Sequence, residues 1–178
     1  MKRFEDMTEH DSAKEANTLN QAQTDQFQRF SGKRFSREEW NTLNQAQIEQ
    51  FRANNGTMVE GLFKGAPMLL LTTNGARSGE ARVTPLTYTH DGDRHVVLAS
   101  KLGAPEHPAW YHNLIANPIV TVEVGPECFQ ARASVVEGSE RDRLFDAHAT
   151  IMPNYAEYQR NTTRVIPVVI LDRIAASV

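Results

Sequence analysis

Short turn signals between strand-like runs are the feature of this sequence that most constrains its fold. After residue 66 the chain is dense in Val, Ile, Leu and aromatic residues, and His90–Asp93 and Gly125-Pro126 each separate two runs with strand composition. Asp-Gly between two such runs is a strong hairpin signal. Hairpin-joined strands pair antiparallel, whereas a parallel sheet needs a helical crossover. The sequence therefore predicts a mainly antiparallel α+β domain, and about six strands around one core predict a small barrel.

The predicted elements follow from turn residues and helix signals. We expect strands at 68–73, 82–89, 94–99, 119–124, 128–136 and 165–171, and helices at 108–117, 139–150 and 154–159. A further helix at about 37–54 precedes the barrel. It starts with a capping box at Ser36 and Glu39, and Asn55-Gly56 is a stop signal. We therefore divide the chain into a polar N-terminal extension, 1–56, and a barrel domain, 57–178.

The polar extension contains a duplication. The segment Asn17–Phe27 recurs as Asn41–Phe51 with nine of eleven positions identical. Two copies are too few for a solenoid, so a local duplication that lengthened the N-terminus is the better interpretation. We expect residues 1 to about 34 to be poorly ordered unless docked. A coiled-coil partner helix is the alternative, although sustained heptads are missing.

Composition excludes several classes of function. The net charge is −3 with a pI near 6.1, which does not fit a nucleic-acid-binding protein. The single cysteine, Cys128, cannot form an intrachain disulfide, and we expect it to be a buried strand residue in a reducing cytosol. No signal peptide or membrane-spanning stretch is recognisable, so we expect a cytoplasmic protein; peripheral membrane association through residues 17–54 is the weaker alternative. The six histidines lack metal-ligand spacing, and no metal site is expected.

Two loops carry residues suited to anions. The segment Thr72–Arg82 holds two arginines, a hydroxyl and two glycines, so its backbone N–H groups and guanidinium groups can meet a phosphate or carboxylate. A solvated hairpin loop is the alternative. The segment Ala99–Pro108 has Ser100-Lys101 between a strand and a helix, which suits an anion or the edge of a ring. A Ser-Lys hydrolase dyad fits less well, because Ser-x-x-Lys spacing is absent.

Aromatic residues on the predicted helices offer further candidates. Trp110 and Asn113 are three apart and share a helix face, which suits a planar ligand, although core packing of Trp110 explains it as simply. Tyr155 and Tyr158 are also three apart. They can donate hydrogen bonds or protons in a pocket, or stack on the barrel surface.

Several motifs occur in the same order as in one known family. They are Leu69–Leu86, Ala99–Pro118, Tyr155–Gln159 and Arg164–Val168, and they cover about residues 66–172. The chain thus resembles the deazaflavin-dependent nitroreductase family, whose members are actinobacterial enzymes that use coenzyme F420. The resemblance implies a split β-barrel related to the FMN-binding barrels. It also implies a set of cofactor-binding residues: Arg77, Ser78, Arg82, Thr84, Pro85, Leu86, Ser100, Lys101, Leu102, Gly103, Ala104, Trp110, Tyr111 and Asn113.

The resemblance further implies hydride transfer from the reduced deazaflavin to an electron-poor small molecule such as an enone, an unsaturated lactone, a quinone or a nitroaromatic. Ser100 and Tyr155 are the predicted catalytic residues, since their hydroxyls can stabilise and protonate the product. The substrate pocket is expected to contain Trp40, Phe51, Thr87, Met152, Tyr155 and Tyr158, with Trp40 and Phe51 as candidates for a covering lid. Met152 and Thr87 stand where the nitroreductase-competent member has tyrosines, which argues against nitroimidazole reduction.

Two alternatives remain open at the level of sequence. FMN can replace the deazaflavin, since related barrels use it. A non-catalytic carrier of a flavin or deazaflavin would have the same groove without an acceptor cavity. We expect a monomer or a homodimer in either case.

Overall fold

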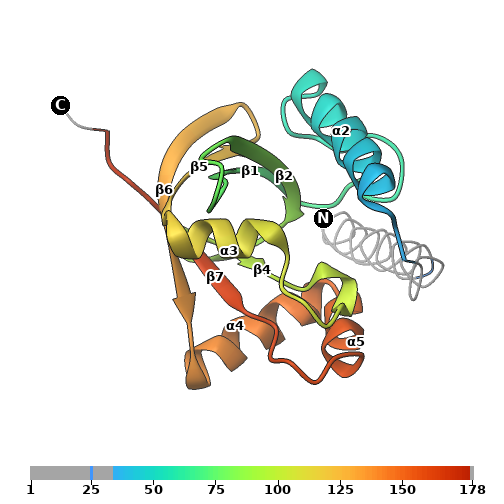
Figure 1. Ribbon diagram of the computed structural model, residues 1–178, viewed down its shortest axis with the longest axis vertical. Helices are drawn as coiled ribbons and strands as arrows, with labels where there is room; N and C mark the ends of the chain where they lie inside the picture. Colours follow the sequence, from blue (N-terminus) through green and yellow to red (C-terminus); the bar gives the residue numbers. More distant parts are fainter. Residues whose placement is uncertain (1–24, 26–33, 177–178) are drawn as a thin grey trace, which may run out of the picture.

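One seven-stranded sheet dominates the structure, a computed structural model that describes Asp25 and residues 34–176. All neighbouring strands are antiparallel, in the order β2-β1-β5-β6-β7-β4-β3. The sheet curls into a split barrel (Figure 1), so the predicted α+β fold is confirmed. The strands are β1 (Met68–Asn74), β2 (Ala81–Thr87), β3 (Thr89–Asp91), β4 (Arg94–Leu98), β5 (Ile119–Val124), β6 (Glu127–Val136) and β7 (Val168–Arg173).

The sheet has seven strands rather than the six expected because the run 82–89 is divided at Tyr88. β2 ends at Thr87 and pairs with β1, whereas β3 begins at Thr89 and pairs with β4. These two strands are the edges of the sheet. Only Tyr88 separates these two edge strands along the chain, so the sheet must curl for β2 to pair with β1 while β3 pairs with β4. At this corner the Tyr88 amide donates to the Pro67 carbonyl, 3.1 Å away.

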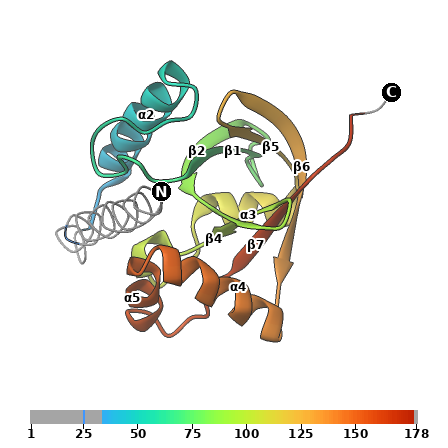
Figure 2. The same ribbon diagram turned by 180° about the vertical axis from the view of Figure 1, so that it is seen from behind.

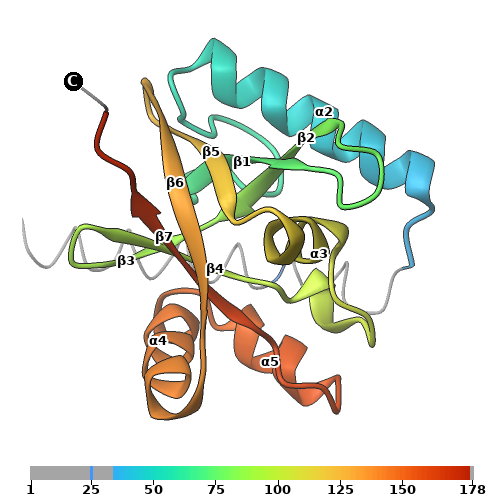
Figure 3. The same ribbon diagram turned by 60° about the vertical axis from the view of Figure 1, so that its left-hand side comes forward.

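Helices cover two opposite sides of the barrel. α2 lies beside β1 and β2, while α4 and α5 lie on the far side near β4 and β7 (Figure 2 and Figure 3). Each helix agrees with its predicted range within one residue at each end. No helix in the described part of the chain is long and apolar enough to cross a membrane. The helices are α2 (Arg37–Ala53), α3 (Ala109–Ala116), α4 (Gly138–Ile151) and α5 (Asn154–Arg160), with a 3₁₀ turn η1 (Lys101–Gly103) before α3.

Both ends of α2 form as the sequence predicts. The Ser36 hydroxyl accepts from the Glu39 amide (3.1 Å), and the Glu39 carboxylate accepts from the Ser36 amide (2.7 Å), which completes the capping box. At the other end Gly56 has φ +86°, and a Cβ there would lie 2.5 Å from Gly125 Cα. Glycine is therefore required where the end of α2 meets the β5–β6 turn. The first copy of the repeat and the expected disorder before residue 34 lie outside the described residues, Asp25 apart.

α2 is joined to the barrel by an apolar core of its own. Ile48 and Phe51 pack with Met68 and Leu70 on the outer face of β1, and Phe51 is only 2% exposed. Alternate residues of a strand face opposite sides, so Leu69, between these two, faces the barrel interior. The helix of the N-terminal extension thus shares a core with the barrel, while the division at residue 56 stays a prediction.

The two faces of the remaining strands fill two further cores. The barrel interior holds alternate residues of β4 and β7, such as Val97 and Val169, together with Trp110 of α3. The outer face of the same strands, including Leu98 and Ile170, packs on α4 and α5. Helices α3 and α5 therefore approach the end of β4 from different sides, and η1 lies where they converge.

Cys128 is exposed, so the prediction that it is buried was wrong. β6 alternates, with Phe129, Ala131 and Ala133 packing in the barrel interior and the residues between them facing outward. Position 128 falls on the outward side. Burial in this strand depends on which of its faces another element covers, and the amino-acid composition of a strand does not predict that.

Candidate functional site

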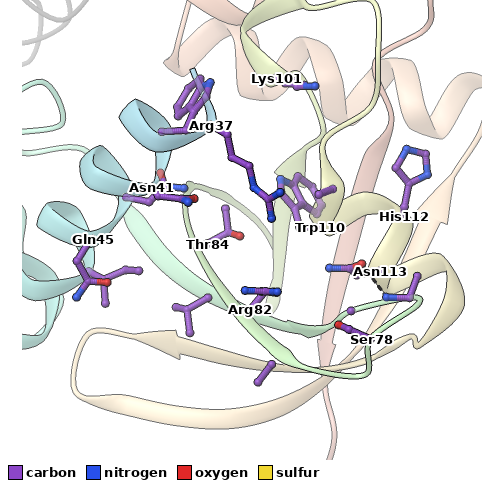
Figure 4. Close-up of a pocket in the computed structure, with 18 of the residues that line it drawn as sticks. Arg37, Asn41, Gln45, Ser78, Arg82, Thr84, Lys101, Trp110, His112 and Asn113 are labelled. Atoms are coloured by element: carbon purple, nitrogen blue, oxygen red, sulfur yellow. Dashed lines mark hydrogen bonds between the residues drawn. The ribbon is translucent and has the colours of Figure 1, made fainter. Parts of the chain in front are cut away.

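Two adjoining cavities lie where α2, β2, η1 and α3 meet. The larger has a volume of about 1300 Å³ and the smaller about 290 Å³. Figure 4 shows the larger cavity, with Arg37, Asn41 and Gln45 of α2 on the opposite wall from Trp110 and Asn113 of α3. The two cavities share six lining residues, Trp40, Asn44, Thr84, Lys101, Ala109 and Trp110, so one ligand can extend from one into the other.

Positive charge is concentrated in the larger cavity. Its lining contains Arg37, Arg52, Arg77, Arg82 and Lys101 and no aspartate or glutamate. The whole chain, in contrast, has a net charge of −3. A concave wall with charge of one sign attracts ligands of the opposite sign. The larger cavity is therefore suited to a ligand with several anionic groups.

Three of these cations form ion pairs with carboxylates of the protein, which would compete with a bound anion. Arg52 pairs with Glu123 (2.9 Å), Arg82 with Glu80 (2.8 Å) and Lys101 with Glu106 (3.4 Å). The Arg82 and Lys101 pairs are exposed and contribute little stability, whereas Arg52 makes two hydrogen bonds to the Glu123 carboxylate. Arg37 and Arg77 form no ion pair within the described residues. Arg37, Arg77, Arg82 and Lys101 can thus turn toward a bound anion at small cost.

The loop that carries Arg77 and Ser78 is held by α3. The Asn113 side chain accepts from the Ala76 amide (3.0 Å) and donates to the Thr73 hydroxyl (3.1 Å). The buried Asn113 amide thus fixes the loop through both of its polar atoms, using two of its four hydrogen-bonding positions. The loop conformation is thereby set by a helix about forty residues further along the chain.

The smaller cavity is mainly apolar with a few hydroxyls. Its apolar lining includes Phe63, Met68, Pro85, Leu86, Leu98 and Leu102. The Tyr155 hydroxyl lies 2.7 Å from the Thr87 hydroxyl, and the Ser100 side chain is close enough to interact with it as well. Burial raises the pKa of Tyr155, while the interactions with Thr87 and Ser100 oppose the shift. The phenol therefore stays protonated at neutral pH and can donate to a ligand oxygen.

A buried histidine backs this tyrosine. The His148 ring is fully buried and stacks edge-on against Tyr155, with ring centroids 4.5 Å apart. Its Nδ1 lies 3.0 Å from the Thr89 hydroxyl, and within the described chain its Nε2 has no hydrogen-bond partner. Burial lowers the pKa of His148 to about 4, so the ring is neutral near pH 7. Its face of α4, shared with Leu144 and Phe145, was the only sequence signal for it, and that signal indicates core packing.

Most predicted site residues line these cavities. Arg77, Ser78, Arg82 and Asn113 line the larger one, while Trp40, Thr84, Lys101 and Trp110 are shared. Pro85, Leu86, Thr87, Ser100, Leu102, Tyr155 and Tyr158 line the smaller one. Their roles stay predictions. Across the described residues, no group of three or more His, Cys, Asp or Glu is arranged to hold a metal ion.

Five predicted residues line neither cavity: Phe51, Gly103, Ala104, Tyr111 and Met152. Phe51 belongs to the core beneath α2, Met152 is buried, and the Tyr111 ring stacks on His107 with centroids 4.7 Å apart. A Cβ on Gly103 would lie 2.8 Å from the Tyr158 carbonyl oxygen. Gly103 therefore permits a close approach of backbones behind the cavity.

Sequence reasoning missed the polar face of α2. Arg37, Asn41 and Gln45 lie four residues apart, so they form one row on the helix that lines the larger cavity. Arg52 extends this face. The spacing was visible in the sequence, but a polar row is also what a solvated helix shows.

Comparison with known proteins finds one family repeatedly. A sequence model of the family described as F420H(2)-dependent quinone reductase matches residues 43–173. A Mycobacterium tuberculosis protein named F420H(2)-dependent quinone reductase is 46% identical over 110 residues, which are 60% of this chain and 74% of that protein. A solved F420-H2 dependent reductase is 41% identical, with 60% of this chain and 94% of that chain covered and a TM-score of 0.56. A solved domain-swapped dimer is 36% identical, with 77% of this chain and 100% of that chain covered and a TM-score of 0.57.

Proposed function

Since this chain belongs to the F420H(2)-dependent quinone reductase family, we propose that its larger cavity holds the anionic part of coenzyme F420 and its smaller cavity holds the quinone that is reduced. Membership confirms the resemblance to deazaflavin-dependent enzymes, and the chain is an F420-dependent reductase of quinone-like acceptors rather than a carrier. The observation that carries the proposal is the meeting of a basic cavity and an apolar one at Lys101 and Trp110.

The residues of the larger cavity fit this cofactor. Its phosphate and acidic tail need several cations, and five cations line the cavity with no carboxylate among them. FMN has a single phosphate, which would leave most of that charge unused. Trp110 and Leu102 offer apolar surface for a flat ring next to the basic wall. When bound in its reduced form, the deazaflavin supplies a hydride.

The smaller cavity fits the acceptor. Reduction of a quinone to a hydroquinone takes one hydride and one proton, and negative charge develops on a quinone oxygen. The Tyr155 and Ser100 hydroxyls lie together in this mainly apolar cavity, where hydrogen bonds to a developing anion are strong. Because its phenol stays protonated, Tyr155 is the proposed proton donor.

Other acceptors are also compatible with this chemistry. Enones and unsaturated lactones take up a hydride and a proton in the same way, and nitroaromatics present oxygens to the same hydroxyls. Thr87 and Met152 stand where the nitroreductase-competent member has tyrosines. Here Thr87 hydrogen-bonds Tyr155, and the buried Met152 lines neither cavity. We therefore propose quinones as the preferred acceptors and nitroaromatics as the poorest.

The assembly and location of the protein also belong to this proposal. We propose a cytoplasmic monomer or homodimer with a small-molecule acceptor and no nucleic-acid partner. The domain-swapped dimer among the similar structures supports the homodimer.

A binding titration followed by turnover tests the proposal. The full chain is titrated with F420 and, separately, with FMN, and binding is followed by fluorescence. The F420H2-loaded protein then receives a quinone, an enone or a nitroaromatic. We expect F420 to bind at least about tenfold more tightly than FMN, because it forms more charged hydrogen bonds, and quinone to be reduced fastest. Equal or tighter binding of FMN would contradict the cofactor assignment, and faster reduction of the nitroaromatic would contradict the acceptor assignment.

A further inference from the structure

Arg164 lies between α5 and β7, behind the segment that joins β4 to α3. Its guanidinium makes four hydrogen bonds to that segment. It donates to the carbonyl oxygens of Ala104 (2.8 Å), Ala99 (3.1 Å) and Ser100 (2.7 Å), and Nη1 lies 3.0 Å from His107 Nδ1. No carboxylate of the described residues forms an ion pair with it. Its hydrogen-bonding capacity is therefore directed at one short stretch of backbone.

That stretch adopts an unfavourable backbone conformation. Lys101 has φ +47°, Leu102 has φ +54° and Gly103 has φ +79°. Residues with a side chain rarely adopt positive φ, and such conformations persist only where the surroundings hold them. The bend places the Ser100 side chain beside Tyr155 in the smaller cavity and Lys101 in the lining of both cavities.

Local hydrogen bonds close the bend but do not attach it to the rest of the protein. The Gly103 amide donates to Ser100 (2.9 Å) and the Ala104 amide to Lys101 (3.0 Å), both within the bend. Arg164, about sixty residues further along the chain, is bonded to both ends of the bend. A guanidinium has five N–H donors in a rigid plane and can serve several carbonyls at once, which an ammonium cannot do in a fixed geometry.

We propose that Arg164 is a positioning residue of the reductase: by clamping both ends of the η1 bend, it keeps Ser100 and Lys101 in the two cavities. Arg164 itself lines neither cavity, so it acts through the residues that it holds. The effect on binding and turnover rests on the proposed function, whereas the effect on the bend does not.

Arg141 provides a matched control. Like Arg164 it is partly buried, and its own side chain is 12% exposed. It also clamps a loop by donating to the Ile166 carbonyl (3.1 and 2.8 Å) and to the Gln159 side chain (2.9 Å). It lies outside both cavities. The Gln159 side chain donates to the Arg164 carbonyl (2.8 Å), so Arg141 supports the loop that carries Arg164, but only Arg164 contacts the bend itself.

The first test measures the cofactor-free full chain. Amide hydrogen exchange is compared in Arg164→Met, Arg164→Lys and Arg141→Met. We expect both Arg164 variants to speed exchange at residues 101–104 by about tenfold relative to the rest of the barrel, as one strained residue relaxes. Arg141→Met should change exchange in that segment much less, because Arg141 reaches the bend only through Gln159 and Arg164. Equal exchange at 101–104 in the Arg164 and Arg141 variants would overturn the proposal. Should Arg164→Met fail to fold, the comparison uses Arg164→Lys, since lysine keeps the positive charge but lacks the planar set of N–H donors.

The second test measures function in the same variants. We expect Arg164→Lys to bind F420 and to reduce quinone about tenfold less well, because Ser100 and Lys101 are no longer held, and Arg141→Met to retain both. Faster exchange at the bend with unchanged binding and turnover would overturn the positioning role. If the unsubstituted chain binds no F420, the proposed function fails, while the exchange comparison still decides whether Arg164 fixes the bend.

Discussion

The larger and smaller cavities share a wall but differ in chemistry and in the elements that build them. α2, the β1–β2 loop and the start of β2 give the larger cavity its arginines, whereas α5, the end of β2 and the segment between β4 and η1 give the smaller cavity its hydroxyls. The larger cavity surrounds ligand charge with exposed, exchangeable cations. The smaller one surrounds a few hydroxyls with apolar side chains, where each hydrogen bond is stronger. Affinity and chemistry are thus assigned to different segments, and substitutions should separate them.

The largest effect is expected from Tyr155→Phe, which removes the proposed proton donor from the smaller cavity. Turnover of the F420H2-loaded enzyme with quinone should fall about a hundredfold, the usual lower range for loss of a general acid. F420 affinity should stay the same, because the larger cavity is untouched. Steady-state kinetics and a binding titration measure the two quantities. Tyr111→Phe, outside both cavities, is the control, and a parallel loss of affinity in Tyr155→Phe would erase the distinction between the cavities.

Acid should destabilise the wall of the smaller cavity through His148. Burial lowers its pKa from the ordinary 6.5 to about 4. Between pH 6.5 and pH 4, His148 is therefore protonated in the unfolded chain and neutral in the folded protein. Stability is fully present above pH 6.5 and is lost as pH falls toward 4. The loss between pH 7 and pH 5 should be about 2 kcal/mol. Urea unfolding at both pH values measures it, and an equal pH dependence in His148→Gln would contradict this origin.

Arg77→Gln should act only on the larger cavity. We expect about tenfold weaker binding of F420, the cost of one charged hydrogen bond, and a smaller effect at high salt. Turnover at saturating cofactor should not change. Titrations at low and high salt test this, with Arg132→Gln on the exposed side of β6 as the matched loss of charge. Similar weakening in both variants would mean that general charge, not this cavity, sets affinity.

The smallest effect is expected at the shared wall. Trp40 lines both cavities, so Trp40→Ala should lower F420 affinity about threefold and raise the KM for quinone about threefold, because aromatic contacts at a partly exposed site are lost. Binding and steady-state measurements on one preparation compare the two. A change in only one of them would assign Trp40 to a single cavity.

Much of this arrangement was predictable because it depends on local rules. The hairpin turns predicted the antiparallel barrel, and the capping box at Ser36 predicted where α2 begins. Most of the loop residues proposed for the cofactor lie in the cavities. Arg37 and His148 were missed for opposite reasons. A polar helix position looks solvated until another element covers it, and a histidine on an apolar face looks like core.

The sequence by itself determined most of the strands, the hairpin turns, the helix ends and the family, because these depend on neighbouring residues and on ordered motifs. Only the tertiary structure decided that Arg164 clamps the η1 bend, that Cys128 faces outward and that α2 supplies a wall of the basic cavity. Each of these depends on which surfaces meet after the sheet curls. Contacts between segments sixty or more residues apart are set by packing, and no local pattern encodes them.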